Sequence, residues 1–381
     1  MVIKMKFLKR YKVDPIILGT IIIFALISIF TIKSSSNILA TDLADLYIKQ
    51  TYWYIIGFIL ALIIMFISND FIYRHIWWLY GLFILLLGGL LIFADPINNA
   101  RCWYTIKGIG SFQPSEFMKI VLIITEATMI HKFNDKNPNP SIKDEFIFLI
   151  QMMIIVLIPS LLTFLQPDTG VVLIYLIITV VMLFISGIRY RWFIMMGVSL
   201  LSIVLIILGV YFINSDLFID IFGTSFFLRV DRLLDWGSKS GFQLENGMSA
   251  IGSGGILGLG FNNTPIYFPE AQTDFIFAVY ASNFGFIGTL FLLSLICIFD
   301  IRLIQTSLKN GNNINKYVMA GILGMLIYQQ IQNIGMTVGL LPITGITLPF
   351  ISYGGSSLLS YMIMVGIIFN ISNENIRYKN K

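Results

Sequence analysis

Long apolar runs constrain the fold of this chain more than any other feature of its sequence. Runs close to the roughly 20 residues that cross a bilayer recur throughout. Charged residues make up only 12% of the chain, against about 25% in a typical soluble domain. Because so little polar surface cannot cover a globule of 381 residues, lipid must be the solvent for most of the chain. The runs predict ten membrane spans, at 15–32, 51–68, 76–94, 114–131, 146–165, 169–187, 192–213, 275–299, 317–340 and 355–372.

The spans are predicted to be α-helices, which makes the chain an all-α polytopic membrane protein. Lipid offers no partner to a backbone N–H or C=O group, so a spanning segment must satisfy its own hydrogen bonds. A β-barrel would need short alternating segments, whereas runs such as IIIFALISIF are continuous. The basic N-terminus precedes a run too long for a cleaved signal peptide, so we interpret that run as the first span. The prediction is a single membrane domain over residues 1–381.

Lysine and arginine are unevenly divided between the two sides of the predicted spans. If the N-terminus is inside, the inner segments hold 17 of the 25 Lys and Arg residues and the outer loops hold seven. The positive-inside rule therefore predicts that both termini are cytoplasmic. The longest outer loop, 214–274, is too apolar and too patterned for disorder, and a loop of that length favours a function.

The composition also excludes several kinds of site. Two cysteines and two histidines are too few for a disulfide framework or a histidine-rich metal centre. A net charge of +5 would indicate nucleic acid for a soluble protein, but here the basic residues flank membrane spans, so no nucleic-acid partner is expected. No spacing of acidic residues defines a metal site, which leaves any metal ligands unknown at this stage.

Glu116 and Lys119 lie inside the fourth predicted span, where each charge costs roughly 2.5–3.5 kcal/mol to insert. Because they are three residues apart, they share one face of the helix and can pair. One interpretation is a structural ion pair that fixes helix packing. The other is a polar cavity that opens outward, in which the pair positions or tunes another group. The two interpretations are compatible.

Asp274 lies at the mouth of the eighth predicted span. Partial loss of hydration there raises the pKa of a carboxyl group toward the range of a general base. An aspartate at this position can also be an N-cap, which stabilises the helix without any chemistry. Spacing alone favours the cap, because caps are common.

Two further outer features are candidates for binding phosphate groups. The glycine-rich stretch 251–260 lacks the Gly-Lys-Ser/Thr ending of a P-loop, so it predicts tight turns or a nest of N–H groups and not a nucleotide site. Arg101, Arg229 and Arg232 are expected on the outer face, and arginine suits diphosphate oxygens. Contact with lipid headgroups explains the same arginines equally well.

Four separated stretches carry a distinctive pattern. They are NNARCWYTIKGIGSFQPSEFMK at 98–119, QPDTG at 166–170, MSAIGSGGILGLG through FPEAQTDFIFAV at 248–279, and NIGMTVGLLPITGITLPFISYGGSSLL at 333–359. Together they resemble the SEDS family (shape, elongation, division and sporulation), which includes RodA, FtsW and SpoVE. The fourth stretch and the short termini somewhat favour a RodA-like member over an FtsW-like one.

The resemblance implies a peptidoglycan glycosyltransferase that polymerises lipid II on the outer face of the cytoplasmic membrane, for elongation or division. The 4-hydroxyl of one lipid II would attack the anomeric carbon of an undecaprenyl-diphosphate-linked glycan. The family's essential aspartate matches Asp274, which moves the interpretation of that residue from cap to general base. The family's glutamate and lysine of the fourth span match Glu116 and Lys119, and its outer arginine matches Arg101.

The resemblance also implies ligands and partners. Residues expected to contact the substrate or its diphosphate are Arg101, Arg229, Arg232, Gln113, Ser352 and Ser356. A divalent cation, Mg²⁺ or Mn²⁺, is expected to support the activity through oxygen ligands, and no organic cofactor is expected. The expected protein partner is a class B penicillin-binding protein, which is a transpeptidase.

Besides Val171, which stands where the family usually has threonine, the chain departs from the family pattern in two places. Ser282 and Asn283 stand where the family commonly has a Glu-Glu pair, and FNNTPI at 261–266 replaces the usual glycine and glutamine. These differences bear on how lipid II is positioned and indicate a divergent paralogue. The alternatives to an enzyme are a flippase for lipid-linked precursors and a non-catalytic cell-wall scaffold. The outward clustering of polar groups disfavours the flippase, and an intact Asp274 disfavours the scaffold.

Overall fold

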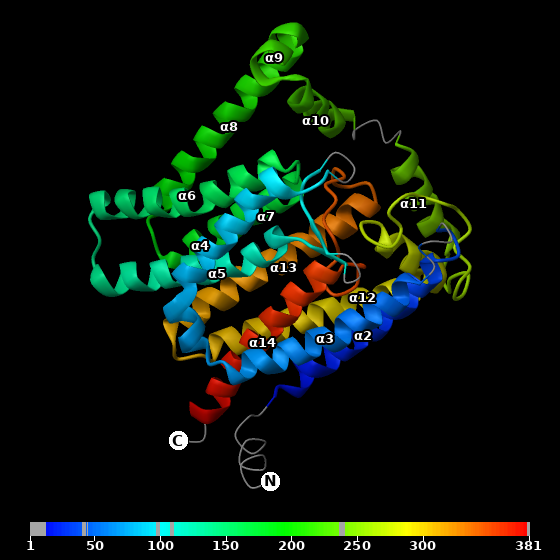
Figure 1. Ribbon diagram of the computed structural model, residues 1–381, viewed down its shortest axis with the longest axis horizontal. Helices are drawn as coiled ribbons and strands as arrows, with labels where there is room; N and C mark the ends of the chain where they lie inside the picture. Colours follow the sequence, from blue (N-terminus) through cyan, green and yellow to red (C-terminus); the bar gives the residue numbers. More distant parts are fainter. Residues whose placement is uncertain are drawn as a thin grey trace.

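The computed structural model describes residues 13–39, 43, 45–96, 100–106, 110–235 and 241–378, and it consists almost entirely of α-helices (Figure 1). Within these residues, ten helices of 18 residues or more correspond to the ten predicted spans. Their bounds are α2 Pro15–Ser35, α3 Leu46–Phe66, α4 Asn69–Phe93, α5 Pro114–Lys136, α6 Ile142–Leu165, α7 Thr169–Ser186, α8 Tyr190–Ile213, α12 Ile276–Leu308, α13 Asn313–Thr337 and α14 Gly355–Tyr378. The predicted all-α membrane fold is confirmed.

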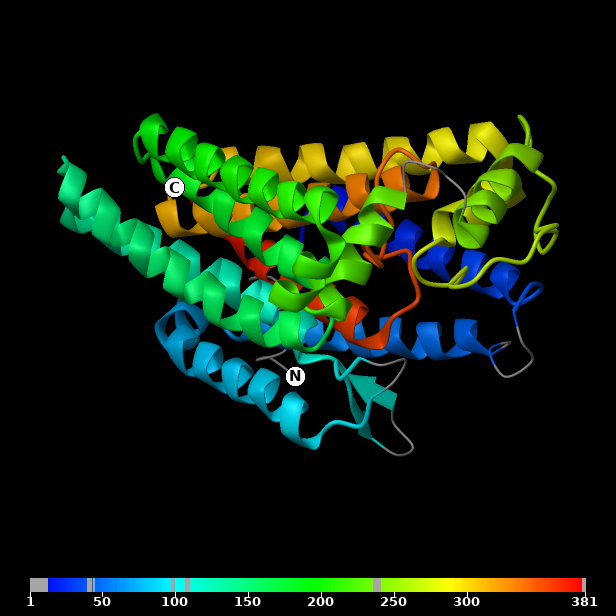
Figure 2. The same ribbon diagram turned by 90° about the horizontal axis from the view of Figure 1, so that it is seen from above.

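Eight of these helices are long and apolar enough to cross a membrane, which makes the chain a multi-pass membrane protein. The other two, α5 and α13, carry buried polar side chains, among them Lys119 and Glu126 of α5 and Gln329 and Asn333 of α13. Both helices lie inside the bundle, where α5 contacts α4, α7, α13 and α14 (Figure 2). Because protein and not lipid surrounds them, their polar groups can find partners.

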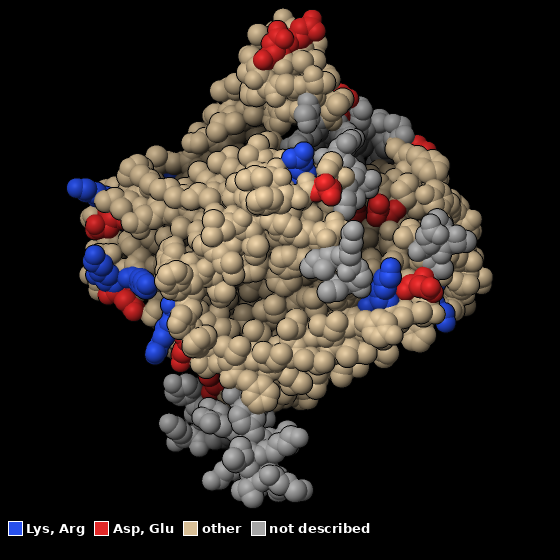
Figure 3. Space-filling view, viewed as in Figure 1, with Lys and Arg blue, Asp and Glu red and all other residues tan. Residues whose placement is uncertain are grey.

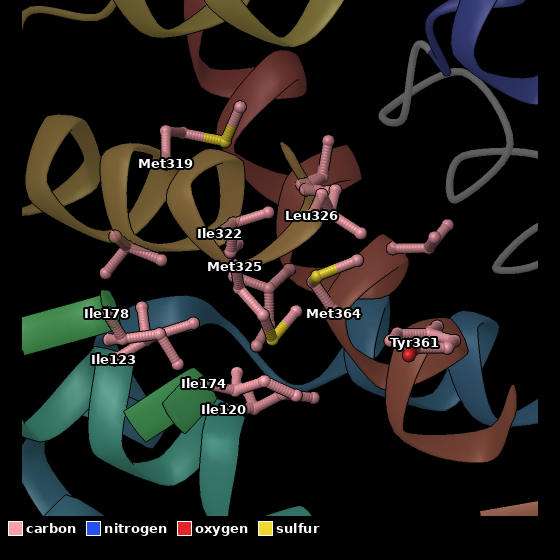
Figure 4. Close-up of a cluster of buried hydrophobic side chains, with 14 of the residues drawn as sticks. Ile120, Ile123, Ile174, Ile178, Met319, Ile322, Met325, Leu326, Tyr361 and Met364 are labelled. Carbon is pink, nitrogen blue, oxygen red and sulfur yellow. The ribbon is translucent and has the colours of Figure 1, made fainter. Parts of the chain in front are cut away.

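The core between α5, α7, α13 and α14 is made of interlocking isoleucine, leucine and methionine side chains, with Tyr361 of α14 beside them (Figure 4). Ile123 of α5, Ile178 of α7, Ile322 of α13 and Met364 of α14 are all fully buried. Gly321 of α13 allows a close helix approach, because a Cβ there would lie 2.8 Å from the Ile123 side chain. This packing fixes the relative positions of the helix ends at which the candidate site lies.

Helix α8 differs from the other long helices because it leaves the bundle and runs toward α9 (Figure 1). Of its residues, all of which the structure describes, only Trp192 is buried. Trp192 Nε1 donates to Glu145 Oε2 of α6 over 2.6 Å, and Arg189 and Arg191 lie 3.5 and 3.6 Å from the same carboxylate. The N-terminal end of α8 is therefore anchored to α6, whereas α8 also packs against α9.

Short elements lie outside the long helices. Strand β1, Tyr104–Ile106, pairs antiparallel with β2, Gly110–Phe112, in a hairpin that the sequence analysis did not predict. The segment 214–274, which is predicted to be an outer loop, contains α9 Ser215–Phe222, α10 Thr224–Asp235 and α11 Phe242–Ser253. Charged side chains gather toward the ends of the bundle, and the middle of the face seen in Figure 3 is almost bare of them. A belt without charges is what a lipid-embedded surface requires.

Candidate active site

Several of the predicted site residues lie together at one end of the bundle, where α5, α7 and α14 begin (Figure 1). The Lys and Arg pattern predicts that this end is outside. Three connections meet there: the β1–β2 hairpin before α5, the turn between α6 and α7, and residues 338–354. Their packing is close, because a Cβ on Gly170 would lie 2.6 Å from the carbonyl oxygen of Thr344.

Asp274 lies in a turn whose backbone is fixed from two directions. Asn333 Nδ2 of α13 donates to the Asp274 carbonyl oxygen over 2.8 Å. Ser352 Oγ, in the segment before α14, donates to the Thr273 carbonyl oxygen over 2.7 Å. The cap position of α12 is occupied by Phe275, whose side chain cannot cap a helix. The geometry therefore holds Asp274 in place without giving it a capping role.

The carboxyl group of Asp274 is half-buried, and its pKa is raised from 3.8 to about 7. Burial is the largest cause, because the charged form loses hydration, and the negative charges of Glu270 and Asp168 add to the rise. Gly345, at φ 70°, borders the carboxylate, and a Cβ there would lie 3.5 Å from Asp274 Oδ2. A fixed carboxylate with a pKa near 7 is suited to accept a proton.

Asp168 is a second acid at this end that sequence reasoning did not select as a site residue. Its Oδ1 accepts from Val171 N–H over 3.2 Å, so it caps α7, and its Oδ2 accepts from Gln113 Nε2 over 2.9 Å. Gln113 Oε1 in turn accepts from Trp103 Nε1 over 3.1 Å. Burial raises the pKa of Asp168 to about 6. The available signal was the same as for Asp274, namely an acid just before an apolar run.

Glu116 and Lys119 are paired as their spacing predicts, with Lys119 Nζ 2.8 Å from Glu116 Oε2. Lys119 is fully buried and its ammonium group lies 5.2 Å from the centre of the Tyr361 ring of α14. The hydroxyl of Tyr361 accepts from Gln329 Nε2 of α13 over 2.8 Å. The pair therefore links α5 to α14 and α13 beneath the two aspartates. Glu126, further along α5, instead accepts from Thr179 of α7 over 2.6 Å.

The hydroxyls of the two predicted serines are already engaged within the protein. Ser352 Oγ accepts from Leu348 N–H over 2.8 Å in addition to its bond to Thr273. Ser356 Oγ accepts from Gln113 N–H over 2.9 Å and donates to the Ser111 carbonyl oxygen over 3.2 Å. These contacts favour a positioning role for both serines, because they tie the segment before α14 to the Asp274 turn and to the hairpin.

Arg101 is exposed, and its NH1 donates to the Leu91 carbonyl oxygen near the end of α4 over 2.9 Å. A guanidinium group has five N–H donors, so several are left for a ligand. Arg229 and Arg232 belong to α10, but their side chains lie outside the described part of the structure. Their predicted contact with diphosphate stays a prediction.

The acidic residues that the structure describes at this end do not form a recognisable metal site. Within the described residues, no group of three or more His, Cys, Asp or Glu side chains could hold a metal ion. Both oxygens of Asp168 already accept hydrogen bonds from protein groups. A supporting role for Mg²⁺ or Mn²⁺ stays a prediction.

The two departures from the family pattern lie where α12 meets the end of α2. Asn283 is buried, and its Nδ2 donates to Ser34 Oγ of α2 over 2.5 Å. Thr264, within the FNNTPI stretch, donates to Asn283 Oδ1 over 3.3 Å. Ser282 is fully buried beside it. These residues therefore form a neutral buried contact between α2, α12 and the preceding loop.

Comparison with known proteins gives consistent relatives. The sequence matches the family described as cell cycle protein over residues 12–377. It is 33% identical over 328 residues to the probable peptidoglycan glycosyltransferase FtsW of Thiomicrospira cyclica, covering 84% of this chain and 79% of that protein. It is 35% identical over 286 residues to stage V sporulation protein E of Bacillus subtilis, covering 72% of each. A solved structure described as structural coordination of polymerization and crosslinking by a peptidoglycan synthase complex has a TM-score of 0.78 at 26% identity, covering 95% of this chain and 98% of that one.

Proposed function

This chain belongs to the FtsW, RodA and SpoVE family of cell cycle proteins and is a peptidoglycan glycosyltransferase, and we propose that its substrate is lipid II. The GlcNAc 4-hydroxyl of one lipid II attacks the anomeric carbon of an undecaprenyl-diphosphate-linked glycan. The new glycosidic bond forms as the bond from that carbon to the diphosphate oxygen breaks. Undecaprenyl diphosphate leaves with the bonding electron pair, and the glycan is one unit longer.

The observation that carries this proposal is the Asp274 carboxylate, fixed at one end of the bundle with a pKa of about 7. A hydroxyl group is a weak nucleophile unless its proton is accepted as the new bond forms. A positioned carboxylate supplies roughly 10²–10⁴-fold in rate by accepting it. Asp274 takes the proton of the attacking 4-hydroxyl in this mechanism.

The leaving diphosphate develops negative charge that must be balanced. Arg101 is the described cation best suited to this, because it is exposed and uses one of its donors on the Leu91 carbonyl oxygen. Arg229 and Arg232 complete the proposed diphosphate contacts. Gln113, Ser352 and Ser356 act on the reaction by holding the surrounding segments, since their own hydrogen bonds are to protein groups.

The proposed setting is the outer face of the cytoplasmic membrane, with both termini in the cytoplasm. The uneven distribution of Lys and Arg supports this orientation. A class B penicillin-binding protein is the proposed partner, which the likeness to a chain of a peptidoglycan synthase complex supports. A role in elongation or shape, slightly preferred over division or sporulation on the RodA-like features, stays a prediction.

The test is to incubate the purified chain, alone and with the partner, with labelled lipid II and to resolve polymer on a gel. The wild-type chain should form glycan strands. Asp274→Asn keeps the size of the side chain but removes the proton acceptor, so polymer should fall by 10²-fold or more. Polymerisation by Asp274→Asn near the wild-type rate would remove Asp274 as the base and shift the search to Asp168, Glu116 or Glu270.

A matched control is Glu245→Gln, an acid-to-amide change at an exposed position of α11. It should polymerise at the wild-type rate. If the wild type, Asp274→Asn and Glu245→Gln unfold at the same temperature, the loss of polymer in Asp274→Asn is due to the missing proton acceptor and not to unfolding. Labelled lipid II in sealed vesicles distinguishes the enzyme from the alternatives. A flippase would move lipid II across the bilayer without forming polymer. A scaffold would neither move lipid II nor polymerise it.

A further inference from the structure

The segment Gly254–Phe261, between α11 and the Asp274 turn, has no role in the proposed reaction. Its sequence, GGILGLGF, contains no polar side chain. Ile256 and Leu257 are 69% and 78% exposed, and Leu259 and Phe261 are exposed as well. A contiguous exposed apolar patch of this kind marks an interaction surface.

The backbone of this segment is paired with a break in α12. Gly285 has φ 63° and ψ −162°, so the helix is interrupted there. In an unbroken helix, the N–H groups of Phe286 and Ile287 would donate to the carbonyl oxygens four residues earlier. Instead, Phe286 N–H donates to Gly255 O over 2.9 Å and Ile287 N–H to Ile256 O over 3.1 Å.

The two carbonyl oxygens freed by the break are satisfied by the same segment. Leu259 N–H donates to Ser282 O and Gly260 N–H donates to Asn283 O, both over 3.0 Å. Four polar backbone groups that the break exposes therefore find partners in the glycine-rich segment. Non-helical backbone is tolerated at membrane depth where it is buried against protein and its polar groups are satisfied, and these four groups meet that condition.

The depth of the segment follows from the helices that it contacts. Arg302 of α12 pairs with Asp14, the N-cap of α2, at 2.7 Å, and this pair marks the inner end of α2. Ile287 precedes Arg302 by fifteen residues, a distance of roughly 22 Å along a helix. The hydrocarbon core is roughly 30 Å thick, so the pairing with Ile256 lies within it.

The outer boundary is marked by the change from apolar to polar residues at the end of the segment. Phe261 packs edge-on against Phe30 of α2, with ring centres 6.1 Å apart. The next residue, Asn262, donates its N–H to Ser34 Oγ over 2.9 Å and accepts from Asn37 Nδ2 over 2.6 Å. Figure 1 and Figure 2 both show the chain after α11 beside this end of α2. The polar residues thus lie at the helix end, and the apolar ones lie deeper.

We propose that Gly254–Phe261 is a re-entrant membrane segment whose side chains insert among the phospholipid acyl chains of the leaflet nearest the candidate active site. Its exposed side chains continue the lipid-facing surface of α12, where Phe286 and Ile287 are 65% and 55% exposed. Lipid is therefore the proposed contact of the segment, because the adjoining surface of α12 is also expected to face lipid. The segment fixes the height of the adjoining Asp274 turn relative to the membrane.

The test uses the full chain with Cys102→Ser and Cys297→Ala, reconstituted in phosphatidylcholine and phosphatidylglycerol vesicles. A single nitroxide-labelled cysteine is placed by Leu257→Cys, and its collisions with oxygen and with a water-soluble nickel chelate are measured. Oxygen concentrates in hydrocarbon and the chelate stays in water. The matched controls are Leu290→Cys, on the exposed face of α12, and Asn263→Cys, at an exposed polar position two residues after the segment.

The label at position 257 should resemble the one at 290, with a ratio of oxygen to nickel collisions several-fold above that at 263. A ratio equal to that at 263 would overturn the proposal, because the segment would then be in water. Low collision rates with both reagents would also overturn it, because the segment would then be covered by protein, such as a second copy of the chain. Ile256→Cys gives an independent second measurement, and none of these readouts depends on polymerisation.

Discussion

Asp274 and the Glu116–Lys119 pair differ in how deeply they are buried, and we propose different roles for them. Asp274 is half-buried with a raised pKa, whereas Lys119 is fully buried with its partner Glu116 at 2.8 Å. A partly hydrated acid can exchange protons, whereas a buried ion pair is retained for structure or specificity. The physical setting of each group therefore separates a proposed reacting residue from a proposed supporting pair.

The raised pKa of Asp274 predicts the pH dependence of polymerisation. The base form is lost as the pH falls through about 7, so the rate should fall on the acidic side of that value. Unfolding does not explain this loss, because an acid whose pKa is higher in the folded state stabilises the fold at low pH and loses that contribution as the pH rises from 3.8 toward 7. Glu270→Gln removes a charge that raises the pKa, so the acidic limb should move to lower pH. Initial polymerisation rates of the wild type and Glu270→Gln on both sides of pH 7 measure this shift. If the acidic limb of the pH–rate profile does not move, a group other than Asp274 titrates.

The Glu116–Lys119 pair predicts coupled effects on stability. Lys119→Ala leaves Glu116 as an uncompensated buried charge and should cost about 3–5 kcal/mol. The double change Glu116→Lys with Lys119→Glu restores a pair and should recover much of the folded yield. Lys132→Ala, at an exposed position of the same helix, is the control and should have little effect. Thermal unfolding in detergent compares the four, and a swap as unstable as the single change would contradict the pairing argument.

The sequence predicts Asp274 and the Glu116–Lys119 pair, but it predicts neither Asp168 nor the long-range hydrogen bonds at this end. Asp274 and the Glu116–Lys119 pair could be predicted because a charge beside or inside an apolar run is visible in the sequence. The bond from Gln113 to Asp168 joins residues 55 apart, and the bond from Ser352 to Thr273 joins residues 79 apart. No local pattern in the sequence records such contacts, so the hydrogen bonds of Ser352 and Ser356 to distant segments could not be predicted from it.

At the scale of elements, the number and approximate positions of the long helices were predictable, and the break in α12 was not. Apolar runs locate helices because each must satisfy its own backbone in lipid. The predicted span 275–299 corresponds to a helix that runs to Leu308 and is broken at Gly285. The break persists because a distant segment supplies its hydrogen bonds, and the glycines of 251–260 allow the two backbones to meet. The alternative of tight turns for that stretch agrees with this geometry.

Gly258 and Gly252 provide a matched pair of substitutions for this element. Gly258 has φ 84°, and a Cβ there would collide with the carbonyl oxygen of Asn283, so Gly258→Ala should destabilise by more than about 1 kcal/mol. Gly252 lies in α11 with open space around it, so Gly252→Ala should be neutral or stabilise by about 0.5–1 kcal/mol. Thermal unfolding of the two variants measures the difference. Equal stability of the two would show that the backbone pairing contributes little.

At the scale of the whole molecule, the distribution of basic residues predicts which compartment each end faces. Reporters fused within 214–270 should be extracytoplasmic, and reporters at either end of the chain or near Lys136 should be cytoplasmic. The measurement is the compartment-specific activity of each fusion. A cytoplasmic signal from 214–270 would overturn the orientation and the proposed location of the reaction.

The polar character of α5 affects how many membrane crossings are counted in the chain, and therefore which side each loop is assigned to. Hydropathy alone selects eight crossings and omits α5 and α13. When one crossing is left out of the count, every later connection is assigned to the opposite side of the membrane. A second omission reverses the assignment again. An eight-crossing count would therefore leave both termini on the side that the ten-crossing count predicts. It would place every connection between α6 and α12, including the turn that holds Asp274, on the opposite side. A single helix sheltered by its neighbours thus determines whether a hydropathy plot assigns Asp274 to the side of the membrane that the distribution of Lys and Arg predicts for it.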